Sequence, residues 1–219
     1  LRNGALAMGF VLALTPSASR WEPLEMFRVA AQYGAPCHVH MRGMGHKEPL
    51  TCIEGLSEIV AAAMASGAPI NVNHVNSSGQ HAIPELLQMI EEVQSHGLDA
   101  TAECYPYTAG LAPIEGALFS EGWRDKFSLD YGDLEWAATG ERLTASTFAE
   151  YREIGGMVIA HSMRQDMVDR AVASPLTAIA SDGWLKNGKG HPRTAGCYSK
   201  VLGHYVRGKR SLSLMEALR

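Results

Sequence analysis

The sequence predicts an α/β protein, with parallel strands and outer helices arranged as part of a (β/α)8 barrel. Two observations support this class. Short apolar runs alternate with segments of helical period, which is typical of parallel strands joined by helices. Several of the apolar runs also end in polar side chains, as the strands of such barrels do at the face that carries the active site. The order of elements favours a barrel over an open sheet, although periodicity alone does not separate the two.

The first half of the chain carries the clearest alternation. A strand is expected wherever an apolar run is short and bounded by turn residues, and a helix wherever apolar residues recur every three or four positions. The expected strands are 5–14, 37–41, 69–75, 98–105, 157–160 and 177–180. The expected helices are 22–33, 52–66, 83–96 and 168–173.

Residues 106–156 break this alternation. The segment is richer in turn and acidic residues than its surroundings, and it is interpreted as an insertion within one barrel domain that spans 1–219. The start of the chain allows two interpretations. Arg2 followed by the apolar run 5–14 resembles a short signal peptide, but the same run ends at Thr15-Pro16 like a buried strand, and the strand is favoured.

Composition excludes several classes of protein. Hydrophobic residues make up 46% of the 219 residues, charged residues 19%, and the net charge is −4, which is ordinary for a globular enzyme. No basic run exceeds the four residues 207–210, so no nucleic-acid surface is expected. The four cysteines are far apart and form no C-x-x-C pair, which favours reduced thiols and a cytoplasmic location. No segment is long enough to span a membrane.

Three strand ends carry side chains that suit a metal. His40 follows Val39, His74 follows Asn73, and Asp182 stands in Ser181-Asp182-Gly183. Because all parallel strands of a barrel end at one face, these side chains are expected to converge. Imidazole and carboxylate are ligands for Zn²⁺ and related divalent ions. Taken singly, each also fits an ordinary surface histidine or a turn, so the prediction depends on the combination.

Five further residues are candidates for the same site. His38 shares a strand face with His40, since residues two apart point the same way. His161 ends another apolar run, and His191 lies close after Asp182 in the sequence. Arg193 is the best candidate for binding an anionic substrate, because guanidinium holds carboxylate with two hydrogen bonds. Tyr105 ends a strand and offers a phenol donor. A surface ion pair for Arg193 and rim packing for Tyr105 are the structural alternatives.

Several motifs together resemble the D-aminoacylases, or N-acyl-D-amino-acid deacylases. The resemblance covers nearly the whole chain in the family's order. Its main motifs are His40-Met41-Arg42, the YPYTAG sequence at 105–110, Ser181-Asp182-Gly183 and Gly190-His191-Pro192-Arg193.

The resemblance implies a metal-dependent amidohydrolase on a (β/α)8 barrel, of which this chain carries about strand four to strand eight. It implies that His40 and His74 are the metal ligands of strands five and six. Asp182 is implied to be the strand-eight aspartate that binds metal or activates water. Arg193 and Tyr105 are implied to hold the carboxylate of a small N-acyl-D-amino acid. The expected cofactor is zinc, as one or two ions, or another divalent metal.

The sequence also departs from the family pattern. Gly43-Met44 follows Arg42 where an acidic pair is common, and Leu111 stands where many members carry a serine. Both departures affect the expected side-chain preference and leave the ligands untouched. The family's first-strand H-x-H pair and its second-strand cysteine ligand are expected upstream of Leu1, so the chain is expected to be part of a longer enzyme.

Two alternative functions remain open. A cyclic amidase related to dihydroorotase or hydantoinase is one, but such enzymes carry a carboxylated lysine on the fourth strand and 5–14 holds no lysine. A non-catalytic remnant of the barrel is the other, and the joint presence of His40, His74, Asp182 and Arg193 argues against it. The acyl group, the amino-acid side chain, the metal count and the oligomeric state are not predicted.

Overall fold

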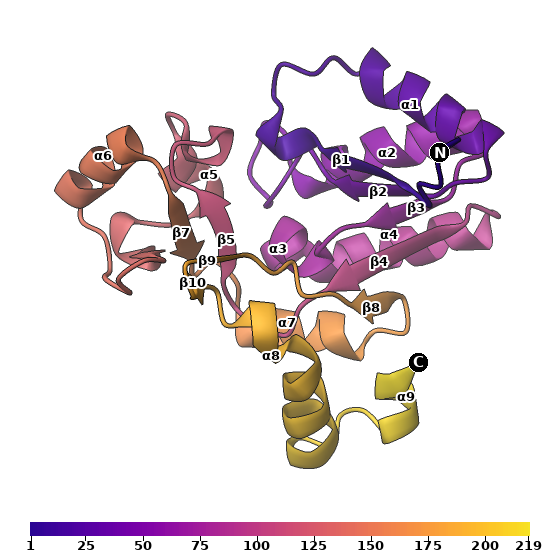
Figure 1. The fold of residues 1–219 in the computed structure, drawn as a ribbon. Coiled ribbons are helices and arrows are strands. Elements are labelled where there is room, and N and C mark those ends of the chain that lie inside the picture. Colours follow the sequence, from indigo (N-terminus) through magenta and orange to yellow (C-terminus); the bar gives the residue numbers. More distant parts are fainter.

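In the computed structural model, which describes all 219 residues, a five-stranded parallel sheet organises most of the chain (Figure 1). Its order is β1-β2-β3-β4-β8, so four strands lie side by side in chain order and the last returns beside β4. The strands are β1 (Met8–Val11), β2 (Cys37–His40), β3 (Ile70–Val72), β4 (Ala100–Cys104) and β8 (Thr177–Ile179). The parallel α/β organisation expected from the alternation is confirmed.

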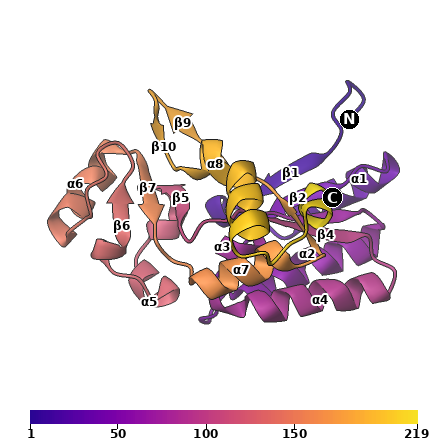
Figure 2. The same cartoon turned by 90° about the horizontal axis from the view of Figure 1, so that it is seen from below.

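Helices connect these strands and pack on one face of the sheet (Figure 2). They are α1 (Trp21–Gln32), α2 (Cys52–Ser66), α4 (Ile83–Ser95) and α7 (Gln165–Ala173). Local signals explain their ends. Thr51 and Glu54 form a reciprocal capping box at the start of α2, and Gly67 ends that helix in the left-handed conformation. The core between sheet and helices is apolar and includes Phe27, Ile59 and Ile90, each fully buried.

The apolar run at 157–160 does form a strand, but it lies in a different sheet. β7 (Met157–Ala160) pairs antiparallel with β5 (Gly110–Pro113) and β6 (Leu134–Trp136). With α5 (Trp123–Phe127) and α6 (Ala145–Ile154) these strands make a separate lobe, which we call the antiparallel lobe (Figure 1). It has its own apolar core around Trp123, Phe148 and Val158. It overlaps the predicted insertion 106–156 and continues into β7; the domain boundaries themselves stay predictions.

The start and end of the chain complete the fold. The run 5–14 forms β1 and then a short 3-10 helix at Leu12–Leu14, so the strand interpretation agrees with the structure. After β8 come a two-stranded hairpin of β9 (Leu185–Lys186) and β10 (Lys189–Gly190), then α8 (Arg193–Lys200), a π-helix at Val201–Gly208 and α9 (Leu214–Leu218). All four cysteines are free and buried. None of the helices is both long and apolar enough to cross a bilayer.

Candidate active site

His40 and His74 meet at the carboxyl ends of β2 and β3. His40 Nδ1 and His74 Nε2 lie 3.1 Å apart in a hydrogen bond, and the two rings pack edge to face. The other ring nitrogen of His40, Nε2, is buried without any hydrogen-bond partner. A buried polar atom without a partner is costly and uncommon in a folded protein. The contact brings the two histidines together at one edge of the sheet, as the strand order predicts. Their role as metal ligands stays a prediction.

His74 is fixed by the short helix that follows it. Its φ of 33° lies in the left-handed region, where residues other than glycine are rare and often functional. This conformation turns the chain directly into α3 (Val75–Gly79). The hydroxyls of Ser77 and Ser78 then reach Nδ1 of His74, at 3.0 and 3.3 Å. These contacts orient the ring so that Nε2 faces His40.

Asp182 enters the site from the end of β8. It also has a positive φ, 45°, so both expected ligands beyond His40 stand on strained backbone. Its Oδ2 accepts a hydrogen bond from Nη2 of Arg193 at 2.9 Å. The Arg193 side chain is only 2% exposed, whereas that of Asp182 is 41% exposed. A buried cation is thus paired with a carboxylate that water can still reach.

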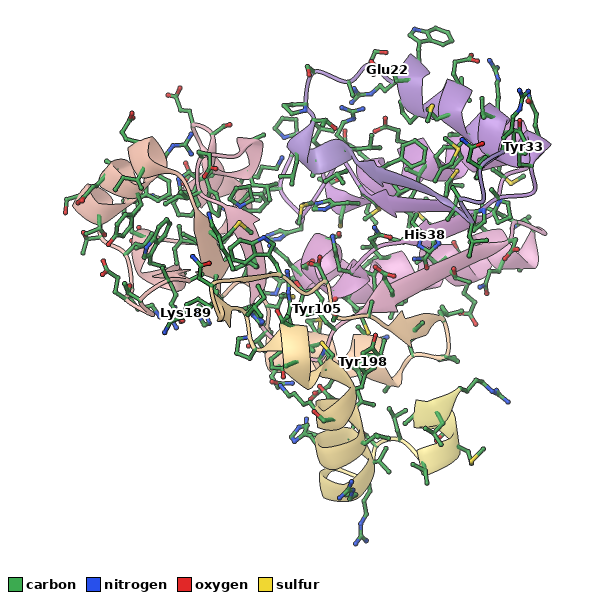
Figure 3. All side chains as sticks on the ribbon, in the orientation of Figure 1. Glu22, Tyr33, His38, Tyr105, Lys189 and Tyr198 are labelled. Atoms are coloured by element: carbon green, nitrogen blue, oxygen red, sulfur yellow. The ribbon has the colours of Figure 1, made fainter.

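Arg193 and Tyr105 contact each other in the site. The guanidinium lies over the Tyr105 ring, 4.5 Å from its centroid, in a cation–π contact. Nε and Nη1 of Arg193 and the hydroxyl of Tyr105 are all buried without a hydrogen-bond partner. Figure 3 shows Tyr105 where the parallel sheet meets the antiparallel lobe. Together these groups offer hydrogen-bond donors that suit an anion. The expected role of both residues in holding a substrate carboxylate stays a prediction.

Tyr105 is itself held by a residue that the sequence did not single out. The Asn76 side chain is fully buried; its Nδ2 donates to Tyr105 O at 3.0 Å, and its Oδ1 accepts from Tyr105 N at 3.3 Å. These two hydrogen bonds satisfy the backbone carbonyl and the backbone N–H of the buried Tyr105. The polar run Asn76-Ser77-Ser78, which begins two residues after His74, was the available signal, because a polar run is unusual inside a fully buried helix.

Burial sets the charge state of the two histidines. It lowers the pKa of His40 to about 3, with His74 adding to the effect, and lowers that of His74 to about 4. Both imidazoles are therefore neutral at pH 7, which is the form that binds a metal. Partial burial raises the pKa of Asp182, although Arg193 and His40 oppose that change. Burial raises the pKa of Tyr105 to about 12, so its phenol keeps its proton.

The remaining candidates lie around the site and do not line it. His38 lies two residues before His40 on β2 (Figure 3). Its Nδ1 is 3.1 Å from Nδ2 of Asn71. His161 Nε2 pairs with Glu135 at 3.0 Å within the antiparallel lobe. His191 is buried, and its Nδ1 accepts a hydrogen bond from the Arg193 backbone at 3.0 Å. Their predicted roles in the reaction stay predictions.

One cavity joins the principal residues. His40, His74, Tyr105, Asp182 and Arg193 all line it. Other lining residues were not predicted from the sequence. They come from the loop after β2, from α3 and the 3-10 helix that follows it, and from the antiparallel lobe; they include Met44, Ser77, Gln80, Leu118, Phe127 and Leu129. No set of three or more histidine, cysteine, aspartate or glutamate side chains lies close enough together to hold a metal ion. The predicted metal site therefore stays a prediction.

The donor chemistry nevertheless fits a divalent ion. Two neutral imidazoles and a carboxylate line the same cavity, and the buried Nε2 of His40 has no other partner. The closest contact within the set is the one between the two histidines, while Asp182 is drawn toward Arg193. Ligand type and the unpartnered nitrogen support metal binding.

Comparisons with known proteins cover the whole chain. No protein-family model matches it. The chain is 28% identical over 220 residues to a D-aminoacylase from Alcaligenes xylosoxydans xylosoxydans, covering 94% of this chain and 44% of that protein. It is 23% identical over 236 residues to the N-acyl-D-glutamate deacylase of the same organism, covering 100% of this chain and 46% of that protein. The chain thus spans about half the length of the curated relatives it matches.

Solved structures share the fold over nearly the whole of this chain and about half of their own length. An N-acyl-D-glutamate deacylase from Bordetella bronchiseptica, complexed with zinc and a phosphonate inhibitor, superposes with a TM-score of 0.80 at 22% identity, over 98% of this chain and 47% of that one. A D-aminoacylase studied for its binuclear metal centre also gives 0.80 at 22%, over 99% and 47%. In sequence and in fold, the chain is similar along its whole length to about half of a D-aminoacylase or N-acyl-D-glutamate deacylase.

Proposed function

We propose that the protein is a metal-dependent amidohydrolase that cleaves N-acyl-D-amino acids to a carboxylic acid and a free D-amino acid. The observation that carries this proposal is the convergence of His40, His74, Asp182 and Arg193 on one cavity from four separate parts of the fold. The activities named for the two curated relatives support the substrate class. We further propose that the parallel sheet is strands four to eight of a (β/α)8 barrel.

His40, His74 and Asp182 would hold the metal. Zinc in the related N-acyl-D-glutamate deacylase and the binuclear centre of a D-aminoacylase support a divalent ion here. Such an ion would polarise the amide carbonyl and lower the pKa of a water molecule. Ser77 and Ser78 keep His74 turned toward the metal position, in the way that second partners of a ligand usually do.

The remaining residues bind substrate and move the proton. Arg193 Nε and Nη1, together with the Tyr105 hydroxyl, are free to donate to the substrate carboxylate. The 41% exposure of the Asp182 side chain lets it contact water, so it can accept the proton of the attacking water and later deliver it to the leaving nitrogen. The Arg193–Asp182 hydrogen bond sets the distance between the bound carboxylate and the proton-transfer group.

A substrate panel on the complete protein tests the proposal. We expect hydrolysis of N-acetyl-D-amino acids, loss of that hydrolysis after a chelator, and its return with Zn²⁺. N-acetyl-L-amino acids, dihydroorotate and hydantoins serve as comparison substrates. Faster turnover of the cyclic amides would favour the cyclic-amidase alternative. Absence of turnover with every substrate, in a folded and metal-loaded preparation, would favour a non-catalytic protein.

A further inference from the structure

The buried guanidinium of Arg193 has few side-chain contacts that hold it in place. Nη2 bonds to Asp182, which is partly exposed to water, and the ring of Tyr105 packs against the group. Nε and Nη1 have no hydrogen-bond partner. The position of the guanidinium therefore depends on where the backbone of Arg193 lies. Because Arg193 is the first residue of α8, the packing of this helix sets that position.

Tyr107 contacts α8 along its length. Its hydroxyl lies so close to Gly196 that a Cβ at this position would come within 2.2 Å of the oxygen. Nζ of Lys200, in the last turn of the helix, lies over the Tyr107 ring, 4.2 Å from its centroid. His191, two residues before the helix, packs edge to face against the same ring, with centroids 5.5 Å apart. Nδ1 of His191 also accepts the hydrogen bond of the Arg193 backbone N–H.

Tyr107 is itself tied to Tyr105. The backbone N–H of Tyr107 donates to the carbonyl oxygen of Tyr105 at 3.0 Å, and Pro106 between them restricts the backbone. One three-residue segment thus contacts the guanidinium through Tyr105 and the helix that carries it through Tyr107. Tyr107 does not line the cavity, so any effect of it on the site passes through α8.

We propose that Tyr107 is a positioning residue, whose packing against Gly196 fixes α8 so that the free donors of Arg193 face the substrate carboxylate. The proposal rests on the proposed function. Glycine is less favourable than alanine inside a helix, and the close approach of the Tyr107 hydroxyl explains its presence at position 196. Precise placement matters, since a displacement of about 1 Å in a binding group can lower a rate on the order of a hundredfold.

Gly196→Ala tests the contact in the zinc-loaded complete protein, with two compounds that differ in one group. N-acetyl-D-leucine carries the carboxylate, and N-isopentylacetamide is the same molecule without it. The added Cβ pushes α8 away from Tyr107, so kcat/KM for N-acetyl-D-leucine should fall at least about tenfold. The value for N-isopentylacetamide should fall no more than about threefold, because this compound offers Arg193 no carboxylate. If N-isopentylacetamide is not cleaved, its inhibition constant takes the place of kcat/KM.

A second substitution should restore what the first one loses. Tyr107→Phe removes the phenolic oxygen, and the Cβ at position 196 then meets the nearest ring carbon at 3.5 Å, an ordinary contact distance. Gly196→Ala combined with Tyr107→Phe should therefore recover kcat/KM for N-acetyl-D-leucine to within about threefold of the parent protein. Gly203→Ala, in the π-helix that follows α8, is the matched control, because nothing lies within 4 Å of its added Cβ. Thermal unfolding and zinc content verify that each variant is folded and loaded.

The outcomes separate the positioning role from the function on which it depends. An unchanged ratio between the two compounds in Gly196→Ala, or no recovery in the double variant, would overturn the positioning role and leave the proposed function in place. If Gly196→Ala does not fold, Tyr107→Leu replaces it, since it removes the ring contacts with His191 and Lys200. An unchanged ratio in that variant would likewise overturn the role. Hydrolysis of no N-acyl-D-amino acid by the parent protein would overturn the proposed function, and the positioning role with it.

Discussion

Arg193 donates a hydrogen bond from Nη2 to Oδ2 of Asp182 at 2.9 Å. This contact connects the residue proposed to bind the substrate carboxylate with the residue proposed to transfer the proton. Arg193 is almost fully buried, so its charge depends on Asp182 for compensation. Asp182 in turn depends on Arg193 for its orientation. A substitution at either residue therefore changes both substrate binding and proton transfer.

Replacing Arg193 should reveal this double role. Arg193→Ala removes a charged hydrogen bond to the substrate carboxylate, worth roughly 1.5–3 kcal/mol, so kcat/KM for N-acetyl-D-leucine should fall about 10- to 100-fold. An N-acetylated amine without a carboxylate should lose less, and only through the effect on Asp182. Steady-state kinetics on both substrates give the comparison. Equal losses would remove Arg193 from the binding role.

The hydroxyls behind His74 should control metal affinity. Ser77→Ala combined with Ser78→Ala removes both contacts to Nδ1 of His74, so zinc affinity should fall about 10- to 100-fold. Competition with a fluorescent zinc chelator measures the change. Ser57→Ala, at an exposed serine of α2 that bonds only to the backbone of Ile53, is the control. Unchanged zinc affinity in the double variant would contradict the positioning role.

Gly43 should be intolerant of even a methyl group. A Cβ at this position would lie 2.0 Å from the carbonyl oxygen of Thr51, so the loop after β2 and the start of α2 would have to separate. Gly43→Ala should therefore destabilise the protein by about 1–3 kcal/mol, seen as a lower thermal midpoint. Gly9→Ala, where nothing lies within 4 Å, is the matched control. Equal midpoints for the two variants would refute the close approach.

Acid should destabilise the metal-free protein well above the pKa of its buried imidazoles. Burial lowers the pKa of His74 to about 4 and that of His191 to about 3, whereas a histidine in the unfolded chain titrates near 6.5. The unfolded chain therefore takes up protons first, and the free energy of unfolding falls as pH drops from about 6.5 to about 4. Asp182, with its raised pKa, acts in the opposite direction as a single group.

Urea midpoints at pH 7 and pH 5, with a chelator present, measure this dependence. His191→Gln should reduce the difference between the two midpoints, because one buried imidazole no longer titrates. His96→Gln, at an exposed position, should leave it as in the parent protein. A parent protein with the same midpoint at both pH values would disprove the account.

The sequence predicted the elements that local patterns determine. Helix α2 begins and ends at the expected residues, because a capping box and a glycine mark its two ends. The proximity of His40 and His74 could be predicted from the sequence, because adjacent parallel strands end at one edge of the sheet. These predictions need only periodicity and strand direction.

The rest depends on contacts between distant parts of the chain. The run 157–160 is as apolar as the parallel strands, yet it pairs antiparallel with β5 and β6. Both partners lie in the turn-rich segment 106–156, where the sequence predicts no strand. Helix α3 has only five residues, which is too short for a helical period to be recognised in the sequence. Its start depends on the left-handed backbone of His74, which no local pattern predicts. Leu118 and Phe127 line the same cavity as His40 and Asp182 only because the antiparallel lobe packs beside the sheet.

Asp182→Asn is the most direct measurement of the central claim, which is that these residues form a hydrolytic metal site. Asparagine keeps the shape and can still accept a hydrogen bond from Arg193, but it cannot accept a proton from water. The variant of the complete protein should fold, keep most of its zinc through His40 and His74, and bind a substrate analogue with similar affinity. Its turnover of N-acetyl-D-leucine should fall at least about a hundredfold. A rate within a few-fold of the parent enzyme, at equal zinc content, would contradict the account.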